Sequence, residues 1–126
     1  MCIRDSIHTG EHNIVSSVFI ECGTMFSADG PVDLRPVGET QFANDIAAKS
    51  ASDLYGPTRV AAGIVGTAFL NAGDSVASVL DAQLEAGGDR FKGIRQAAAR
   101  DADPSVPDHR TCPPQGLYTD LSLIHI

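Results

Sequence analysis

Short apolar segments alternate with helix-like segments along this chain, and that alternation limits the fold more than any other feature. Residues 13–22 are rich in β-branched and aromatic side chains, and their nearly continuous apolarity is typical of a strand covered on both faces. Residues 59–66 and the shorter stretch 90–95 are the second and third strand candidates. Because helical crossovers join parallel strands, this order predicts an α/β fold of about three parallel strands with two intervening helices.

The first predicted helix begins at Pro36, a residue that suits the first turn of a helix. Glu39 places a carboxylate near the helix start, where it complements the helix dipole. Apolar side chains then recur at helical spacing, at Phe42, Ala43, Ile46 and Ala47. The sequence Tyr-Gly-Pro at 55–57 is expected to stop this helix before the second strand.

The second helix is expected over about 74–86, with Gly73 or Asp74 as its cap. One stripe of its surface is formed by Val76, Val79, Leu80, Gln83 and Leu84. Gly87 and Gly88 should end it, because glycine tolerates the backbone conformations found at helix ends. After Gln96 the chain becomes rich in Asp, Pro and Arg, which predicts a long loop up to Gly116.

The two ends of the chain, residues 1–6 and 121–126, are interpreted as translated sequencing adapter. Back-translation of the first residues gives a DNA word whose reverse complement encodes Leu-Ser-Leu-Ile-His, which is the sequence at 121–125. Such processing scars are set aside before a fold is considered. The alternative is a natural Cys-containing N-terminus and an apolar C-terminal strand. We therefore expect the protein body to be residues 7–120, and expect it to be a piece of a larger enzyme.

Composition excludes several classes of partner. The formal net charge is −7 and Lys and Arg do not cluster, which argues against nucleic acid and anionic membranes. No apolar run approaches the roughly 18 residues of a membrane span. Two distant cysteines, Cys22 and Cys112, make no disulfide framework, so a reducing, cytoplasmic location is expected. Cys22 ends an apolar run, and the sequence predicts it to be a small buried hydrophobe rather than a nucleophile.

Five short sequence motifs occur in this chain in a fixed order, and the spacing between them resembles that of a known family. They are VFIEC at 18–22, RPVGET at 35–40, YGPTR at 55–59, AGIVG at 62–66 and FKGIR at 91–95. Together they resemble the amidohydrolase-related family of predicted metal-dependent TIM-barrel hydrolases, which includes sugar lactonases and the pyrone-dicarboxylate lactonase. The resemblance covers most of residues 13–116 and implies a partial (β/α)8 TIM barrel, with the three strands as barrel strands 2–4.

The resemblance also implies a divalent, zinc-like metal in the parent protein, although some lactonases of this kind work without one. The family's usual ligands, a His-x-His pair on the first strand and residues on the fifth, sixth and eighth, would lie outside these three strands. His8 and His12 are spaced so that a helix would bring them to one face, but a zinc site needs at least one more protein ligand. We expect His8 and His12 to be solvated, and His109 lies in a loop among Pro and Asp without a spacing partner. No metal ligand and no catalytic residue is predicted in this chain.

The carboxyl ends of barrel strands carry the function of this fold, which makes Glu21, Thr67, Arg95 and Gln96 the candidate substrate-binding residues. The Arg95 guanidinium could grip a substrate carboxylate with two nitrogens or stabilise an oxyanion. Its alternative is a salt bridge to Glu21 or Asp101. Glu21 is an acceptor that orients another residue, or else a satisfied carboxylate at a strand end.

The chain departs from the family's sequence motifs at two places. Gln96 stands where relatives often carry His, and an amide can orient a substrate but cannot shuttle a proton. Thr67-Ala68-Phe69 replaces the His-Ala-Asp that often follows the third barrel strand.

Asp101 and Asp103 offer paired carboxylates, but two aspartates in a Pro-rich loop usually form solvated turns.

The leading functional hypothesis is a piece, itself inactive, of an amidohydrolase-superfamily hydrolase that opens a lactone or acts on another small carboxylated molecule. A decarboxylase of the same superfamily is the nearest alternative, since the same barrel site supports both reactions. A non-catalytic α/β binding domain is the third. Against it, neither Gly-x-Gly-x-x-Gly nor a Gly-Lys-Ser/Thr loop follows a strand candidate.

Overall fold

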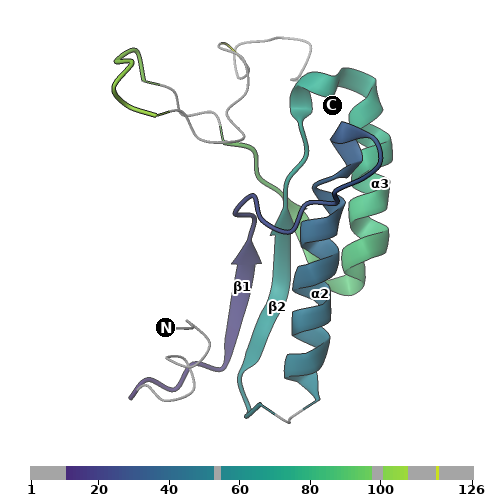
Figure 1. The fold of residues 1–126 in the computed structure, drawn as a ribbon. Helices are drawn as coiled ribbons and strands as arrows, with labels where there is room; N and C mark the ends of the chain where they lie inside the picture. The colour runs from purple at the N-terminus through teal and green to yellow at the C-terminus, as the bar shows by residue number, and fades with distance from the viewer. Residues whose placement is uncertain (1–10, 53–54, 98–100, 108–115, 117–126) are drawn as a thin grey trace.

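The protein is an α/β unit in which a three-stranded parallel sheet packs against two helices (Figure 1). The computed structural model describes residues 11–52, 55–97, 101–107 and 116. Its strands are β1 (Ser16–Ile20), β2 (Arg59–Gly66) and β3 (Phe91–Ile94), and its helices are α2 (Val37–Ala51) and α3 (Val76–Gly87). The predicted α/β class, the three parallel strands and the two intervening helices are thereby confirmed.

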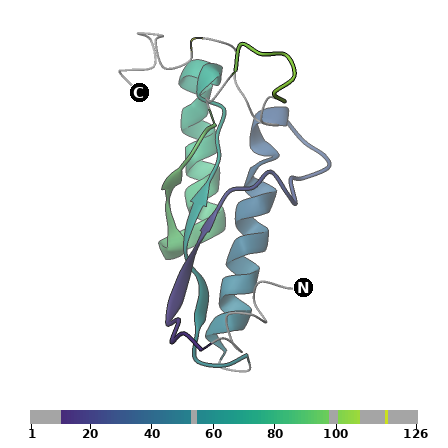
Figure 2. The same ribbon diagram turned by 90° about the vertical axis from the view of Figure 1, so that its left-hand side faces the viewer.

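Both helices lie on the same face of the sheet, side by side (Figures 1 and 2). α2 packs against β2 and against α3, so β2 is the strand around which the core forms. The core side chains are small, and Ile64 in the middle of β2 is completely buried. Its other apolar members are Ala43, Ala47, Ala61, Ala68, Val76 and Val79. Alanine on α2 allows the helix to approach the sheet closely.

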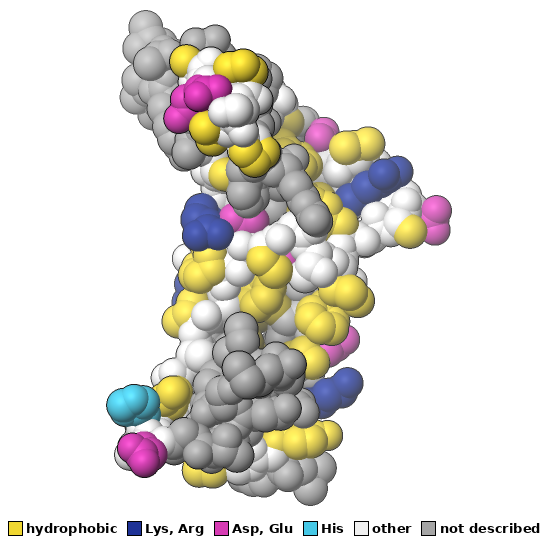
Figure 3. Space-filling model, turned by 60° about the vertical axis from the view of Figure 1, so that its left-hand side comes forward, with side chains coloured by type: hydrophobic (Ala, Val, Ile, Leu, Met, Phe, Trp, Pro, Cys, Tyr) yellow, Lys and Arg dark blue, Asp and Glu magenta, His cyan; other side chains and the backbone are white. Residues whose placement is uncertain are grey.

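The opposite face of the sheet is open in the described part of the chain. Val18 is 59% exposed and Ile20 is 38% exposed, and the pattern of burial alternates along β1. Figure 3, which brings the side away from the helices forward, shows hydrophobic side chains gathered over the middle of this surface. Within the described residues, the strand predicted at 13–22 is covered by helices on one face only, because both helices pack on that face.

Glycines mark the two sides of the sheet. A Cβ placed on Gly63 would lie 3.6 Å from Val18 Cγ2 and 3.5 Å from Lys92 Cγ, so these residues share the open face. A Cβ on Gly66 would lie 2.8 Å from Thr40 Oγ1 and so would press into the layer of helices. The absence of a side chain at Gly66 is therefore what allows α2 to sit close to the end of β2.

The predicted start of the second helix needed correction. α3 begins at Val76 with Ser75 as its N-cap, not with Gly73 or Asp74, because a 3-10 helix (Leu70–Ser75) precedes it and Gly73 kinks the chain with φ 62°. α3 ends at Gly87, and Gly88 has φ 52°, as the glycine pair predicted. Short 3-10 helices also precede α2, at Val32–Leu34, and β3, at Gly88–Arg90.

The predicted stripes of the helices are only partly buried. On α3, Val76, Val79 and Gln83 are buried, but Leu84 is exposed. On α2, Phe42 is exposed, whereas the polar side chains of Glu39 and Thr40 are buried. The spacing of apolar residues predicted the two helices correctly, but it did not always predict which of their side chains are buried. Among the described residues, no helix combines the length and the apolarity that a membrane crossing demands.

Candidate functional site

The carboxyl ends of the three strands lie level with one another. The backbone N–H of Glu21 donates to the Val65 carbonyl at 2.8 Å, and the N–H of Arg95 donates to the Gly66 carbonyl at 2.9 Å. These bonds continue the parallel ladder just beyond the strands. The residues that follow β1, β2 and β3 are therefore neighbours, and Glu21 and Arg95 meet above Gly66.

Glu21 and Arg95 form an ion pair across the ends of the strands. The Arg95 Nε–H donates to Glu21 Oε1 at 2.9 Å, and Nη2 lies 2.8 Å from the same oxygen and donates to the Glu21 backbone carbonyl at 3.0 Å. The Glu21 side chain is 1% exposed, while that of Arg95 is 56% exposed. Of the alternatives considered for Arg95, the salt bridge to Glu21 is present.

This geometry limits what Arg95 can still bind. A guanidinium has five N–H donors, and its Nε and Nη2 edge matches a carboxylate with two nitrogens. Here that edge faces Glu21, which leaves Nη1 as the nitrogen turned away from the ion pair. A ligand that reached Arg95 in this conformation would therefore be held by one nitrogen, not by the two-nitrogen grip that we expected.

The other two candidate residues are anchored by their neighbours. Thr67 is buried, and its backbone carbonyl accepts a 2.9 Å hydrogen bond from the Gln83 amide of α3. Gln96 is 6% exposed, and its Oε1 accepts the Leu70 N–H at 2.8 Å. Gln96 thus fixes the start of the 3-10 helix after β2, and its proposed contact with a substrate stays a prediction.

Glu39, in the first turn of α2, lies beneath the segment that follows β1. Its Oε1 accepts hydrogen bonds from the backbone N–H of Cys22 and of Thr24, each at 3.0 Å, and from the Cys22 thiol at 3.3 Å. The carboxylate is almost completely buried. The sequence placed Glu39 correctly at the helix start but did not predict this contact, which spans 15 to 17 residues.

Cys22 is exposed, so the prediction that it is a buried hydrophobe was wrong. β1 ends at Ile20, and the chain leaves the sheet before Cys22 can enter the core. Partial desolvation raises the pKa of the Cys22 thiol, and the adjacent Glu39 carboxylate raises this pKa further by accepting the S–H and by its charge. The thiol is consequently held in its protonated form.

Several buried oxygens have no hydrogen-bond partner within the described residues. Those at this end of the sheet are Oε2 of Glu21, Oε2 of Glu39 and Oγ1 of Thr67. Further in, Thr40 Oγ1 and Gln83 Oε1 share this property and lie close to Gly66. Buried polar atoms are usually satisfied, so their concentration here separates this end of the sheet from the rest of the unit.

A metal site is not formed by these side chains. In residues 11–52, 55–97, 101–107 and 116, no three or more His, Cys, Asp or Glu side chains are grouped so that they could hold an ion. His12 lies exposed in the segment before β1, while His8, His109 and Cys112 lie outside the described residues, as do residues 1–6 and 121–126, for which the adapter interpretation stays a prediction.

Asp101 and Asp103 form turns, as expected of aspartates in a Pro-rich loop. Asp101 Oδ1 accepts the N–H of Asp103 at 2.9 Å, and Asp103 Oδ1 accepts the N–H of Ser105 at 2.8 Å. The hydrogen bonds from Ser105 lower the pKa of the exposed Asp103 carboxyl. These carboxylates are therefore engaged locally, and the ion pair of Arg95 is made with Glu21.

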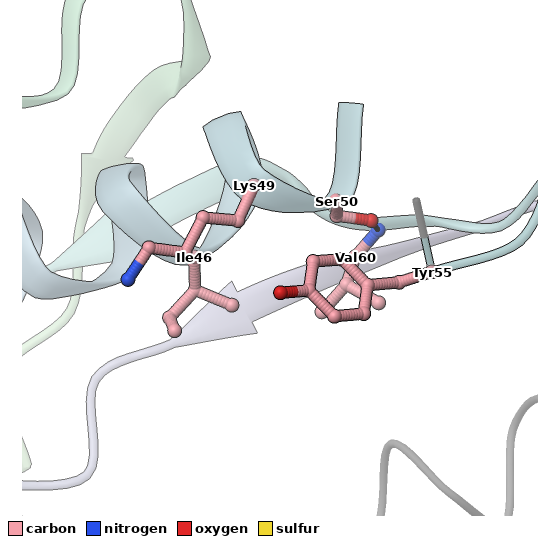
Figure 4. Close-up of a pocket in the computed structure, with 5 residues that line it drawn as sticks. All are labelled: Ile46, Lys49, Ser50, Tyr55 and Val60. Atoms are coloured by element: carbon pink, nitrogen blue, oxygen red, sulfur yellow. Dashed lines mark hydrogen bonds between the residues drawn. The ribbon is translucent and has the colours of Figure 1, made fainter. Parts of the chain in front are cut away.

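A small hollow lies at the opposite end of the sheet, between the end of α2 and the start of β2 (Figure 4). It is lined by Ile46, Lys49, Ser50, Tyr55 and Val60. Its cavity volume is about 10 Å³, roughly the space that one water molecule requires. Ser50 Oγ donates to the Thr58 carbonyl at 2.9 Å and accepts the Val60 N–H at 3.0 Å, so this hollow borders a structural junction.

Comparisons of the chain with protein-family models, with curated proteins and with solved structures returned no match. The resemblance to the amidohydrolase-related family therefore rests on the sequence words alone.

Proposed function

We propose that the chain is one sector of a (β/α)8-barrel hydrolase of the amidohydrolase-related kind, in which these strands are barrel strands 2–4. The sequential strand order, the two helices on one face and the open apolar second face support this proposal. A barrel strand needs helices outside and packed side chains inside, and it has a neighbour on each edge. In this proposal the open face, with Val18 and Ile20, turns toward the barrel interior.

Within that barrel, the sector binds substrate and does not perform the chemical step. The observation that carries this role is the ion pair of Arg95 with the buried Glu21, at the carboxyl ends of β3 and β1, the two strands that flank β2. Glu21 fixes the guanidinium in one orientation, and more than half of the Arg95 side chain stays accessible. A preorganised cation of this kind binds an oxygen of the substrate that carries negative charge or partial negative charge, such as a carboxylate oxygen or a lactone carbonyl oxygen.

Single-nitrogen binding through Nη1 refines the expected substrate. A lactone carbonyl, or one oxygen of a carboxylate, could accept a hydrogen bond from Nη1. A carboxylate that bound both Nε and Nη2 would have to displace Glu21. The divalent metal implied by the family resemblance enters no step here, because the described residues do not supply its ligands.

The test begins with the natural coding sequence on both sides of residues 7–120. The proposal expects an upstream strand ending in His-x-His and further strand–helix repeats downstream. The longer protein should open small lactones, which is detected by acid release. Carbon dioxide release would identify the decarboxylase instead. A stop codon soon after Asp120 with no such upstream strand would contradict the barrel.

Arg95 is tested in that longer protein. Arg95→Ala should raise KM roughly 10- to 100-fold, the loss expected for one hydrogen bond to a charged group. Lys49→Ala removes the same charge at the opposite end of the sheet and should leave KM unchanged. Equal KM values for Arg95→Ala and the unmodified enzyme would remove Arg95 from the binding site.

A further inference from the structure

We infer that Glu39 is a positioning residue, whose carboxylate fixes the backbone from Cys22 to Thr24 and thereby sets the rim of the site beside Glu21. Its Oε1 receives three donors from this one short segment: the N–H of Cys22, the N–H of Thr24 and the Cys22 thiol. An ionised acceptor makes such bonds shorter and stronger than a neutral one does. A single side chain of α2 therefore holds both ends of a three-residue segment.

The segment that follows is shaped to lie over the helix start. Gly23 and Met25 have positive φ angles, 69° and 53°, and the latter is uncommon for a side chain without a local hydrogen-bonding group. A Cβ on Gly38 would come within 2.8 Å of the Met25 carbonyl oxygen, so the chain runs directly over this turn of α2. Ser27 N–H then donates to the Arg35 carbonyl at 2.9 Å. The contacts above Gly38 leave Glu39 directly below Cys22 and Thr24.

The position of this segment connects Glu39 with the candidate site. Cys22 follows Glu21 directly, and the Glu21 backbone carbonyl is one of the two acceptors that orient the Arg95 guanidinium. A shift of the Cys22 backbone would therefore move an acceptor of Arg95. The relevance of this rim to a ligand rests on the proposed function, but the positioning itself can be measured without any ligand.

Cys22 reports on the position of Glu39. In the full chain with Cys2→Ser and Cys112→Ser, Cys22 is the sole thiol, and its alkylation by iodoacetamide is followed as a function of pH. Glu39 and Glu21 are the charged groups that act on this thiol, and Glu39 acts more strongly. In Glu39→Gln the pH midpoint of alkylation should move down, and the rate near pH 8 should rise roughly threefold or more.

Amide hydrogen exchange gives the second readout. The Cys22 and Thr24 amides should exchange about tenfold faster in Glu39→Gln, since a bond to a charged acceptor contributes roughly this factor or more. Asp45→Asn removes the same charge from an exposed position on α2 and should change neither readout. If Glu39→Gln loses helix content, Glu39→Asp replaces it, because the shorter side chain withdraws the carboxylate while its charge is kept.

The outcomes separate this inference from the proposed function. Unchanged alkylation profiles and unchanged exchange of both amides in the Glu39 variants would overturn it, as would an equal shift in Asp45→Asn. A positive result here together with an unchanged KM in Arg95→Ala would retain the role of Glu39 and reject the ligand site.

Discussion

The two faces of the sheet differ in how completely they are built. On the helix-covered face, Ile64 is fully buried and Gly66 is packed so tightly that even a methyl group would collide with Thr40. On the open face, Val18 is more than half exposed, and Gly63 has only ordinary contacts. The helix-covered face is packed closely, as in a protein interior. The open face carries apolar side chains that no described element covers. A cover for the open face is what the proposed barrel would supply.

The strongest contrast between the faces is expected at their aliphatic side chains. Ile64→Ala should destabilise the sheet by about 2–5 kcal/mol, because it removes buried methyl groups and leaves a cavity. Val18→Ala should cost less than about 1 kcal/mol, since Val18 already contacts water. Hydrogen exchange of the β2 amides measures both values. Similar costs, measured at a concentration where the chain is monomeric, would mean that the chain itself covers the open face.

The glycine pair sharpens the same contrast with one added methyl group on each face. Gly66→Ala should destabilise by about 1–3 kcal/mol, because its Cβ would lie 2.8 Å from Thr40 Oγ1 and 3.2 Å from Phe91 Cε2. Gly63→Ala should change stability by less than about 1 kcal/mol, since its nearest neighbour would be 3.5 Å away. Protease susceptibility of the two variants compares them directly. Greater damage from Gly63→Ala would reverse the assignment of the faces.

The ion pair at the strand ends should contribute less than the core. Arg95→Met leaves the buried Glu21 carboxylate without its cation, so the expected loss is about 1–3 kcal/mol, although the Arg95 side chain itself is mostly exposed. In a double-mutant cycle with Glu21→Gln, the second substitution should cost little once the first is present. Additive effects, measured by exchange of the Arg95 amide, would show that the two side chains do not interact.

The smallest effect concerns alkaline pH. The pKa of Cys22 is raised in the folded chain above its ordinary value of 9.0, so the thiol favours folding below pH 9. That contribution should disappear as the pH rises through the raised pKa, because a thiolate would then face Glu39. Relative to Cys22→Ala, the unmodified chain should lose a few tenths of a kcal/mol in this range. A parallel decline of both proteins with pH would contradict the contact.

The sequence predicted the positions of the helices and strands better than the burial of their side chains. β2 was expected at 59–66 and occurs there, because an unbroken apolar run between turn residues leaves few alternatives. The burial of Cys22 was misjudged, since the apolarity of a run does not tell where the chain leaves the sheet. Local patterns determine where a strand forms, whereas burial depends on which elements pack together.

The candidate site was predictable to a similar degree. The rule that parallel strands carry function at their carboxyl ends pointed to Glu21 and Arg95, and the salt bridge between them was one of two alternatives considered. The contact of Glu39 with Cys22 and Thr24 was not predictable, because it depends on the path of the intervening loop. A glutamate followed by a threonine at a helix start, with both side chains turned inward, leaves no periodic signal.

The association state of the chain tests the open face most directly. Sedimentation velocity over a range of concentrations, with a hydrophobic dye, should show self-association and dye binding, because apolar side chains and edge strands are exposed. The double variant Val18→Lys, Ile20→Lys should reduce both, whereas Leu84→Lys, which alters an exposed apolar residue on α3, should not. A chain that stays monomeric at every concentration and binds no dye would contradict the account.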